Sequence, residues 1–152
     1  MKICTYHPSY ASAFKALNIE WLETYFYVEP YDNKVLSNPE KYIIDTGGHI
    51  FFAIDQDRVL GTVALMPIEG QNIYELTKMA VLPETRGKGI GKKLLEHCIH
   101  FVKSQQHPSL ILYSHRSLES AIHLYKKYGF TEIPVEENAH YKRADIKMEL
   151  TF

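Results

Sequence analysis

The sequence is short of cysteine and of long apolar runs. Its two cysteines, Cys4 and Cys98, lie far apart and form no Cys-x-x-Cys pair, so they provide neither a disulfide framework nor a zinc site by themselves. No apolar stretch approaches the roughly 20 residues that cross a bilayer, and the first residues lack the apolar core of a signal peptide. We therefore expect a cytoplasmic protein in a reducing compartment.

The chain also lacks a concentration of charge of one sign. Its 17 lysine and arginine residues and 18 aspartate and glutamate residues are interspersed, and the formal net charge is -1 at pH 7. A block of basic residues would attract nucleic acid or anionic lipid, and no such block occurs. The sequence predicts neither nucleic acid nor membrane as a partner.

The eight histidines do not form a metal-binding pattern. His97 and His100 are three residues apart and share one face of an expected helix. No third ligand and no His-Glu-x-x-His pattern accompanies them, so we expect no metal site.

What the sequence does contain is an alternation of strand-like and helix-like segments over a length suited to one domain, residues 1–152. The expected elements are a strand at 3–6, a helix from Pro8 to about Tyr25, a surface flap with one or two brief helices at 28–45, a hairpin of strands at 50–54 and 59–66 with a bulge at Gly61, a strand at 73–81, a helix at about 89–105, a strand at 110–113, a helix at 118–128 and a last strand at 143–150. The order β-α-α-β-β-β-α-β-α-β-β mixes hairpins with crossovers. It predicts an α/β architecture, a mixed sheet with helices on both faces.

A glycine-bearing loop, residues 86–91, follows the strand at 73–81. Its sequence Arg-Gly-Lys-Gly-Ile-Gly lets successive backbone amides converge on an anion at the positive end of the next helix, and phosphate is the expected guest. A Walker A loop would need glycine in place of Arg86 and serine or threonine in place of Lys93. A dinucleotide fingerprint would need Gly-x-Gly-x-x-Gly in a βαβ unit. Both nucleotide motifs are therefore disfavoured.

The pattern that does match is Arg/Gln-x-x-Gly-x-Gly/Ala, formed by Arg86, Gly89 and Gly91. A second block at 121–130, Ala-Ile-His-Leu-Tyr-Lys-Lys-Tyr-Gly-Phe, and a closing stretch at 141–150 accompany it. With these motifs the sequence resembles the GNAT superfamily of N-acetyltransferases over most of its length. The resemblance implies a mostly antiparallel mixed sheet of about seven strands flanked by about four helices.

The resemblance also implies acetyl-CoA as the cofactor, with the loop binding its pyrophosphate and the preceding strand binding its pantetheine arm. The family often has an asparagine where this sequence has Leu118, so that contact is either absent here or supplied elsewhere, with Ser117 as the candidate. The implied cofactor-binding residues are Met79, Ala80, Val81, Arg86, Gly87, Lys88, Gly89, Ile90, Gly91, Ser117 and Tyr125.

Acetyl transfer to an amine requires a base for the amine, a donor for the developing oxyanion and an acid for the departing thiolate. The resemblance makes Tyr125 the acid; from the residues alone, a core tyrosine bonded to a backbone carbonyl is the alternative. Glu75 is the candidate base, with a solvated glutamate at a strand edge as the alternative. The resemblance also implies that a backbone amide near Ala80 or Val81 meets the oxyanion.

Tyr27 and Glu29 are the candidate acceptor-binding residues, because an aromatic and acidic wall would suit a cationic amine. A flap packed on the core is the alternative reading of this region. The leading hypothesis is an enzyme that acetylates a primary amine of a small molecule or protein by direct attack in a ternary complex, with a homodimer suggested by analogy. The alternative is a non-catalytic module that senses acyl-CoA.

Overall fold

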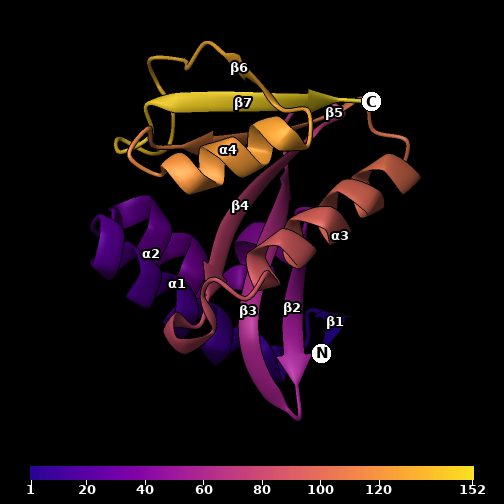
Figure 1. Ribbon diagram of the computed structural model, residues 1–152. Helices are drawn as coiled ribbons and strands as arrows, with labels where there is room; N and C mark the ends of the chain where they lie inside the picture. The colour runs from indigo at the N-terminus through magenta and orange to yellow at the C-terminus, as the bar shows by residue number, and fades with distance from the viewer.

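Seven strands form one sheet in the computed structural model, which describes residues 1–152 (Figure 1). The strands are β1 (Lys2–Thr5), β2 (His49–Asp55), β3 (Arg58–Pro67), β4 (Tyr74–Val81), β5 (Ser109–Ser114), β6 (Thr131–Ile133) and β7 (Ile146–Thr151). Their order in the sheet is β1-β2-β3-β4-β5-β7-β6, and only β4 and β5 pair in parallel. The predicted mostly antiparallel mixed sheet and the predicted order of elements are confirmed.

Four α-helices accompany the sheet: α1 (Ala11–Tyr25), α2 (Pro30–Ser37), α3 (Ile90–Ser104) and α4 (Glu119–Lys127). Short 3₁₀ turns at Pro8–Tyr10 and Pro83–Thr85 and a π-helical turn at Glu40–Ile44 complete the elements. None of the helices combines the length and the apolar composition needed to cross a membrane.

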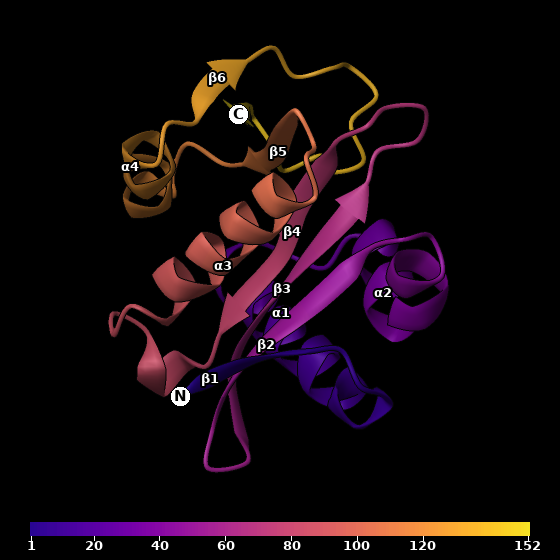
Figure 2. The same cartoon turned by 90° about the vertical axis from the view of Figure 1, so that its right-hand side faces the viewer.

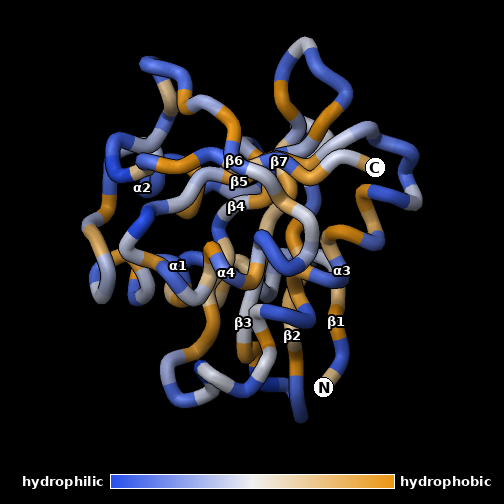
Figure 3. Tube along the Cα trace, turned by 45° about the horizontal axis from the view of Figure 1, so that its top comes forward, coloured by the Kyte–Doolittle hydropathy of each residue, from blue (hydrophilic) through white to orange (hydrophobic).

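The helices cover the two faces of the sheet with separate apolar cores. Side chains of α3 and the partly buried side of α4 pack with β2 to β5 and β7 on one face, and α1 and α2 pack on the other face of β2 and β3. In Figure 2, α3 crosses in front of β4 while α1 lies behind β3. Hydrophobic segments recur along β2, β3 and α3 in Figure 3. The buried side of α3 is made of predicted residues: Ile90, Leu94, Leu95, Cys98 and Val102.

The region at 28–45 contains the brief helices that we predicted, α2 and the π-helical turn, but they pack on the core and do not form a surface flap. Pro30 occupies the first turn of α2, where its missing N–H is harmless, and the Asp32 carboxylate accepts a hydrogen bond from the Glu29 amide at 3.0 Å. Val35 and Leu36 are buried in the core beside α1. The alternative, a segment packed on the core, is the correct one.

The centre of the sheet contains two irregularities that open a site. Thr62 pairs with Ala80 and Ala64 with Thr77, so Lys78 and Met79 together oppose Val63 in a β-bulge, and Lys78 has a φ of 55°. The β4–β5 ladder ends at the pair Leu76–Leu112. Beyond this pair β4 has no strand on its β5 side, and its backbone groups there are free to bond a ligand.

Candidate active site

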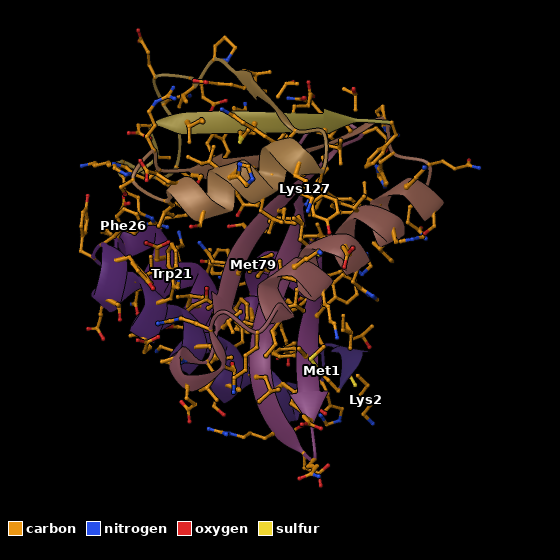
Figure 4. The ribbon with its side chains drawn as sticks, viewed as in Figure 1. Met1, Lys2, Trp21, Phe26, Met79 and Lys127 are labelled. Carbon is orange, nitrogen blue, oxygen red and sulfur yellow. The ribbon has the colours of Figure 1, made fainter.

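A cleft of about 550 Å³ lies where β4 and β5 diverge. Its size is within the range of small-molecule sites. Figure 4 places Met79 on β4 in the space between α3 and α4, with Trp21 and Phe26 on the side of α1. The walls come from α1, β4, β5, the first turns of α4 and residues 141–144 of the loop between β6 and β7. The cleft therefore has one half toward α3 and α4, the cofactor half, and one toward α1, α2 and this loop, the acceptor half.

Six of the predicted cofactor-binding residues line the cleft: Met79, Ala80, Val81, Arg86, Ser117 and Tyr125. The other five, residues 87–91, form the loop and the first turn of α3 and do not line it. Gly87 and Gly89 both have a φ of 81°, a left-handed conformation that favours glycine. The side chain of Ile90 is buried in the core, so only its backbone is available to a ligand.

This loop fits the phosphates of coenzyme A. Gly89 caps the N-terminus of the 15-residue helix α3, where unpaired amides and the helix dipole favour an anion. The exposed side chain of Lys88 forms no ion pair within the chain. Arg86 is different, because its guanidinium pairs with Glu20 of α1 and lies 5.5 Å from the centre of the Tyr25 ring.

Ser117 precedes α4 and is held by a local interaction. Its hydroxyl lies 2.7 Å from Nδ1 of His115, and its amide donates to the same nitrogen at 3.1 Å. The Nε2 atom of His115 lies 3.4 Å from Asp145. Both Ser117 and Leu118 line the cleft, so the position of the family's usual asparagine does face the cofactor half.

Tyr125 of α4 lines the cleft with a half-buried side chain that packs against Phe130. Its hydroxyl has no hydrogen-bond partner within the protein. The hydroxyl is thus not tied to a backbone carbonyl, which was the alternative to a catalytic role. Burial raises the pKa of Tyr125 to about 12, so the side chain keeps its proton at neutral pH.

Glu75 is a buried residue of β4 and not a solvated glutamate at a strand edge. Its Oε2 atom accepts a hydrogen bond from the Tyr141 hydroxyl at 3.2 Å, and no cation lies within ion-pair distance. Burial raises the pKa of Glu75 to about 7, although the charge of Lys78 and the bond from Tyr141 oppose the rise. A carboxyl group with this pKa can exchange a proton at neutral pH, but Glu75 does not line the cleft.

The predicted acceptor-binding residues Tyr27 and Glu29 do not line the cleft either. The side chain of Tyr27 is 54% exposed on the outer surface. Glu29 is buried, and its carboxylate accepts hydrogen bonds from the Lys142 amide at 2.9 Å and from Nη1 of Arg143 at 2.8 Å. Because these bonds occupy its oxygens, Glu29 holds the β6–β7 loop and is not an open wall for an amine.

Sequence reasoning missed the residues that occupy the acceptor half. Lys78 places its Nζ atom 3.1 Å from Oδ1 of Asp32, and the two nitrogens of the Arg143 guanidinium lie 2.6 and 3.0 Å from the two Asp32 oxygens. Burial would raise the pKa of Asp32, but Arg143 and Lys78 outweigh it and hold the pKa below its ordinary value. The signal in the sequence was the pair of charged residues, Glu75 and Lys78, within a mostly apolar strand.

Comparison with known proteins gives one family. The model of the acetyltransferase (GNAT) family matches residues 14–130. Over 104 residues the chain is 32% identical to N-acetylaspartate synthetase of Xenopus tropicalis, a match that covers 68% of this chain and 38% of that protein. The chain thus spans well under two thirds of the length of this relative.

Solved structures show the same fold. An acetyltransferase of the GNAT family from Staphylococcus aureus Mu50 superimposes with a TM-score of 0.86 at 24% identity, over 99% of this chain and 98% of that one. The PaiA N-acetyltransferase from Thermoplasma acidophilum, whose structure contains coenzyme A, gives a TM-score of 0.73 at 21% identity over all of both chains.

Proposed function

The chain belongs to the GNAT family of acetyltransferases, and we propose that it transfers the acetyl group of acetyl-CoA to a primary amine of a small molecule or protein. The amine attacks the thioester directly, with both substrates bound. The observation that carries this proposal is the cleft between β4 and β5, which holds the partner-free hydroxyl of Tyr125 and opens toward the start of α3.

The cofactor half of the cleft supplies binding and an acid. Acetyl-CoA brings the activated acetyl group and a sulfur that leaves with negative charge. Backbone amides of residues 87–91 bind the phosphates, and the backbone of Met79 to Val81 binds the pantetheine arm and meets the oxyanion. Tyr125 donates its proton, or a hydrogen bond, to the departing sulfur. Its pKa of about 12 keeps that proton in place until it is needed.

The base lies behind the acceptor half, next to the lining residue Tyr141. Glu75 has a pKa of about 7, so its carboxylate can take a proton from an amine and return it to water at neutral pH. The aromatic side chains of Trp21, Tyr25 and Phe26 form the α1 wall of this half and would contact the carbon chain of the acceptor.

A turnover screen tests this function. Polyamines, amino acids, aminoglycosides and peptides are each mixed with acetyl-CoA and enzyme, and release of the coenzyme A thiol is measured. Calorimetry with coenzyme A and with ATP accompanies the screen. Thiol release with at least one amine is expected. Coenzyme A binding without release would favour the acyl-CoA sensor, and ATP binding without coenzyme A binding would overturn both.

Tyr125→Phe tests the acid. Turnover is expected to fall by about 10²-fold or more, the usual contribution of a positioned acid, while the Kd for acetyl-CoA stays within about twofold. Tyr128→Phe is the matched control, because Tyr128 lies at the end of the same helix but does not line the cleft. Equal turnover by Tyr125→Phe and wild type across a pH series would remove Tyr125 from the acid role.

A further inference from the structure

Glu75 is close to the cleft but does not line it, and Tyr141 lies between. The Tyr141 side chain lines the acceptor half and donates its hydroxyl hydrogen toward Oε2 of Glu75 at 3.2 Å. Thr77 and Lys78, which also line the cleft, approach the same hydroxyl at 3.2 and 3.4 Å. Tyr141 therefore joins the Glu75 carboxyl to the cleft by a hydrogen bond of ordinary length.

Around the Tyr141 hydroxyl, buried carboxyl groups outnumber cations. Three buried carboxyl groups, those of Glu29, Asp32 and Glu75, face two cations, Lys78 and Arg143. Ion pairs join the first two carboxylates to the two cations, and Glu75 has no ion pair. With all five groups ionised, the cluster carries one uncompensated negative charge in a buried place. Either a proton on Glu75 or a cation in the cleft would compensate it.

We propose that Tyr141 relays a proton from the acceptor to Glu75, and that the acceptor half takes an aliphatic amine that arrives as an ammonium ion. The inference rests on the acetyl transfer proposed above and names the path and the substrate class of that reaction. An ammonium ion beside Tyr141 balances the charge of Glu75 before the transfer. After the transfer the proton on Glu75 does so, and the bound amine is neutral.

The relay moves one proton at each end and leaves Tyr141 unchanged. An N–H bond of the ammonium breaks, its electron pair stays on nitrogen, and the Tyr141 oxygen takes the proton. The original O–H bond of Tyr141 breaks at the same time, and its proton forms an O–H bond with Oε2 of Glu75. The nitrogen then has the lone pair that attack on a thioester requires.

In this relay the acceptor takes the place of one existing contact of the Tyr141 oxygen. Its longest contact, 3.4 Å, is with Nζ of Lys78, and that ammonium keeps Asp32 as its partner at 3.1 Å when the contact is replaced. Burial and then the charge of Glu75 raise the pKa of Tyr141 well above its ordinary value. The phenol therefore stays neutral between transfers, as a relay must.

Two other acids close to the cleft, Asp32 and Glu136, are poor replacements for Glu75. Asp32 has both oxygens bonded to cations, which lowers its pKa and makes it a poor base. Glu136 bonds the Tyr113 hydroxyl and Lys147, and those partners lower its pKa against the effect of burial. Glu75 alone among the buried carboxyl groups has a pKa raised into the neutral range.

Kinetics with a matched pair of acceptors provide the first test. Ethylamine is mostly protonated at neutral pH, whereas trifluoroethylamine is nearly the same size and mostly neutral. With ethylamine, kcat/KM should fall by about 10²-fold in Tyr141→Phe, in Glu75→Gln and in the double variant alike, because all three interrupt one path. With trifluoroethylamine the three losses should be much smaller. Tyr6→Phe, which removes a hydroxyl bonded to Glu40 outside the cleft, is the control.

Titration of Glu75 by NMR of ¹³C-labelled carboxyl groups gives a second readout that needs no turnover. The charged and titratable groups that face Glu75 are Tyr31 on α2, Lys78 on β4, Tyr113 on β5, Tyr141 in the β6–β7 loop and Lys147 on β7. Wild type should titrate near pH 7. Tyr141→Phe removes a bond that favours the carboxylate and should raise the pKa. Ethylamine, added to enzyme saturated with coenzyme A, should lower the pKa in wild type by placing a cation nearby.

The outcomes separate the two proposals. Multiplied losses in the double variant, or equal losses with both amines, would overturn the relay and leave acetyl transfer intact. If wild type binds coenzyme A but acetylates no amine in the wider screen, acetyl transfer fails. In that case the NMR titration alone tests whether Tyr141 and a bound ammonium ion interact with the Glu75 carboxyl. If neither Tyr141→Phe nor ethylamine changes the pKa of Glu75, the proposed relay is wrong.

Discussion

The two halves of the cleft use different groups of the protein, backbone in one and side chains in the other. The cofactor half uses backbone: a glycine loop, the N-terminus of α3 and the unpaired side of β4 after Leu76. The acceptor half uses buried charged and aromatic side chains, and one carboxylate there, that of Asp32, bonds both Lys78 and Arg143. A backbone site recognises groups that do not vary, such as phosphate, whereas a side-chain site can be changed to suit another acceptor.

The two halves also differ in how their parts depend on one another. An amide at a helix N-terminus needs no partner from elsewhere in the chain, because the helix orients it. A buried ion needs its counterion, and removal of one partner leaves an uncompensated charge. We therefore expect changes in the cofactor half to affect mainly binding, and changes in the acceptor half to affect stability strongly as well.

The largest expected effect is the loss of coenzyme A binding in Gly89→Glu. A side chain at a φ of 81° is strained, and a carboxylate at the start of α3 repels phosphate. Calorimetry should detect no binding. Gly70→Glu is the matched control, because Gly70 has a φ of 76° and open space around it but lies in the turn before β4. Similar loss of binding in both variants would mean that strain alone, and not the position, is responsible.

The next effect belongs to the acceptor half. Arg143→Met leaves Glu29 and Asp32 buried without their shared cation and should lower the free energy of unfolding by about 3–5 kcal/mol. Arg58→Met breaks the exposed pair with Glu84 and should leave the free energy of unfolding nearly unchanged, because exposed ion pairs contribute little. Urea denaturation measures both. The proposed difference between the halves would be wrong if Arg143→Met had the same free energy of unfolding as wild type. It would also be wrong if the variant lost more free energy of coenzyme A binding than free energy of unfolding.

Glu75 should make the fold less stable as the pH rises, which is the opposite of the usual effect of a carboxyl group in an ion pair. Its pKa rises from 4.5 in the unfolded chain to about 7 in the fold, so the folded state binds the extra proton between these values. Stability from this group is present at low pH and lost as pH rises through 7, by about 3 kcal/mol at roughly 1.4 kcal/mol per pKa unit. Glu75→Gln should remove this loss.

Urea denaturation of wild type and Glu75→Gln from pH 5 to pH 8 measures the difference, in which the titration of all other groups cancels. The free energy of unfolding of Glu75→Gln should increase relative to that of wild type as the pH rises. Glu69→Gln, at an exposed position in the turn before β4, should show no such trend. Parallel curves for wild type and Glu75→Gln would show that the carboxyl titrates at its ordinary pKa.

The sequence allowed prediction of the cofactor half because its parts are local. Residues 79–91 and 117–125 are each continuous, and a glycine spacing records the backbone conformation directly. The amphipathic pattern of 90–102 likewise predicted which side of α3 is buried. Periodicity also placed Tyr125 on the inward face of α4, and the residue lines the cleft there, whereas its role as the acid was implied by the resemblance and stays a prediction.

The acceptor half could not be predicted because its contacts join distant residues. Arg143 meets Glu29 across 114 positions and Tyr141 meets Glu75 across 66. These contacts form when the β6–β7 loop folds onto α2, and they delay the start of β7 to Ile146, three residues after the predicted start. Glu75 and Lys78 in an apolar strand indicated buried charges that need partners, but no local pattern named the partners.

The smallest expected effect lies where the two halves meet, at the pair of Arg86 and Glu20. The side chains are 25% and 39% exposed, so Glu20→Gln should change the free energy of unfolding by less than about 1 kcal/mol. It should also free Arg86 for the phosphates and strengthen coenzyme A binding about twofold to fivefold at low salt, an effect that screening removes at about 1 M salt. Calorimetry measures both conditions.

Glu23→Gln is the matched control for this pair, because Glu23 lies on the same helix, is exposed and forms no ion pair. It should leave affinity unchanged at either salt concentration. Weaker binding by Glu20→Gln would reverse the interpretation, because Glu20 would then hold Arg86 in the position that coenzyme A requires. In that case α1, a wall of the acceptor half, would also help to build the cofactor half, and the division between the halves would no longer hold at this point.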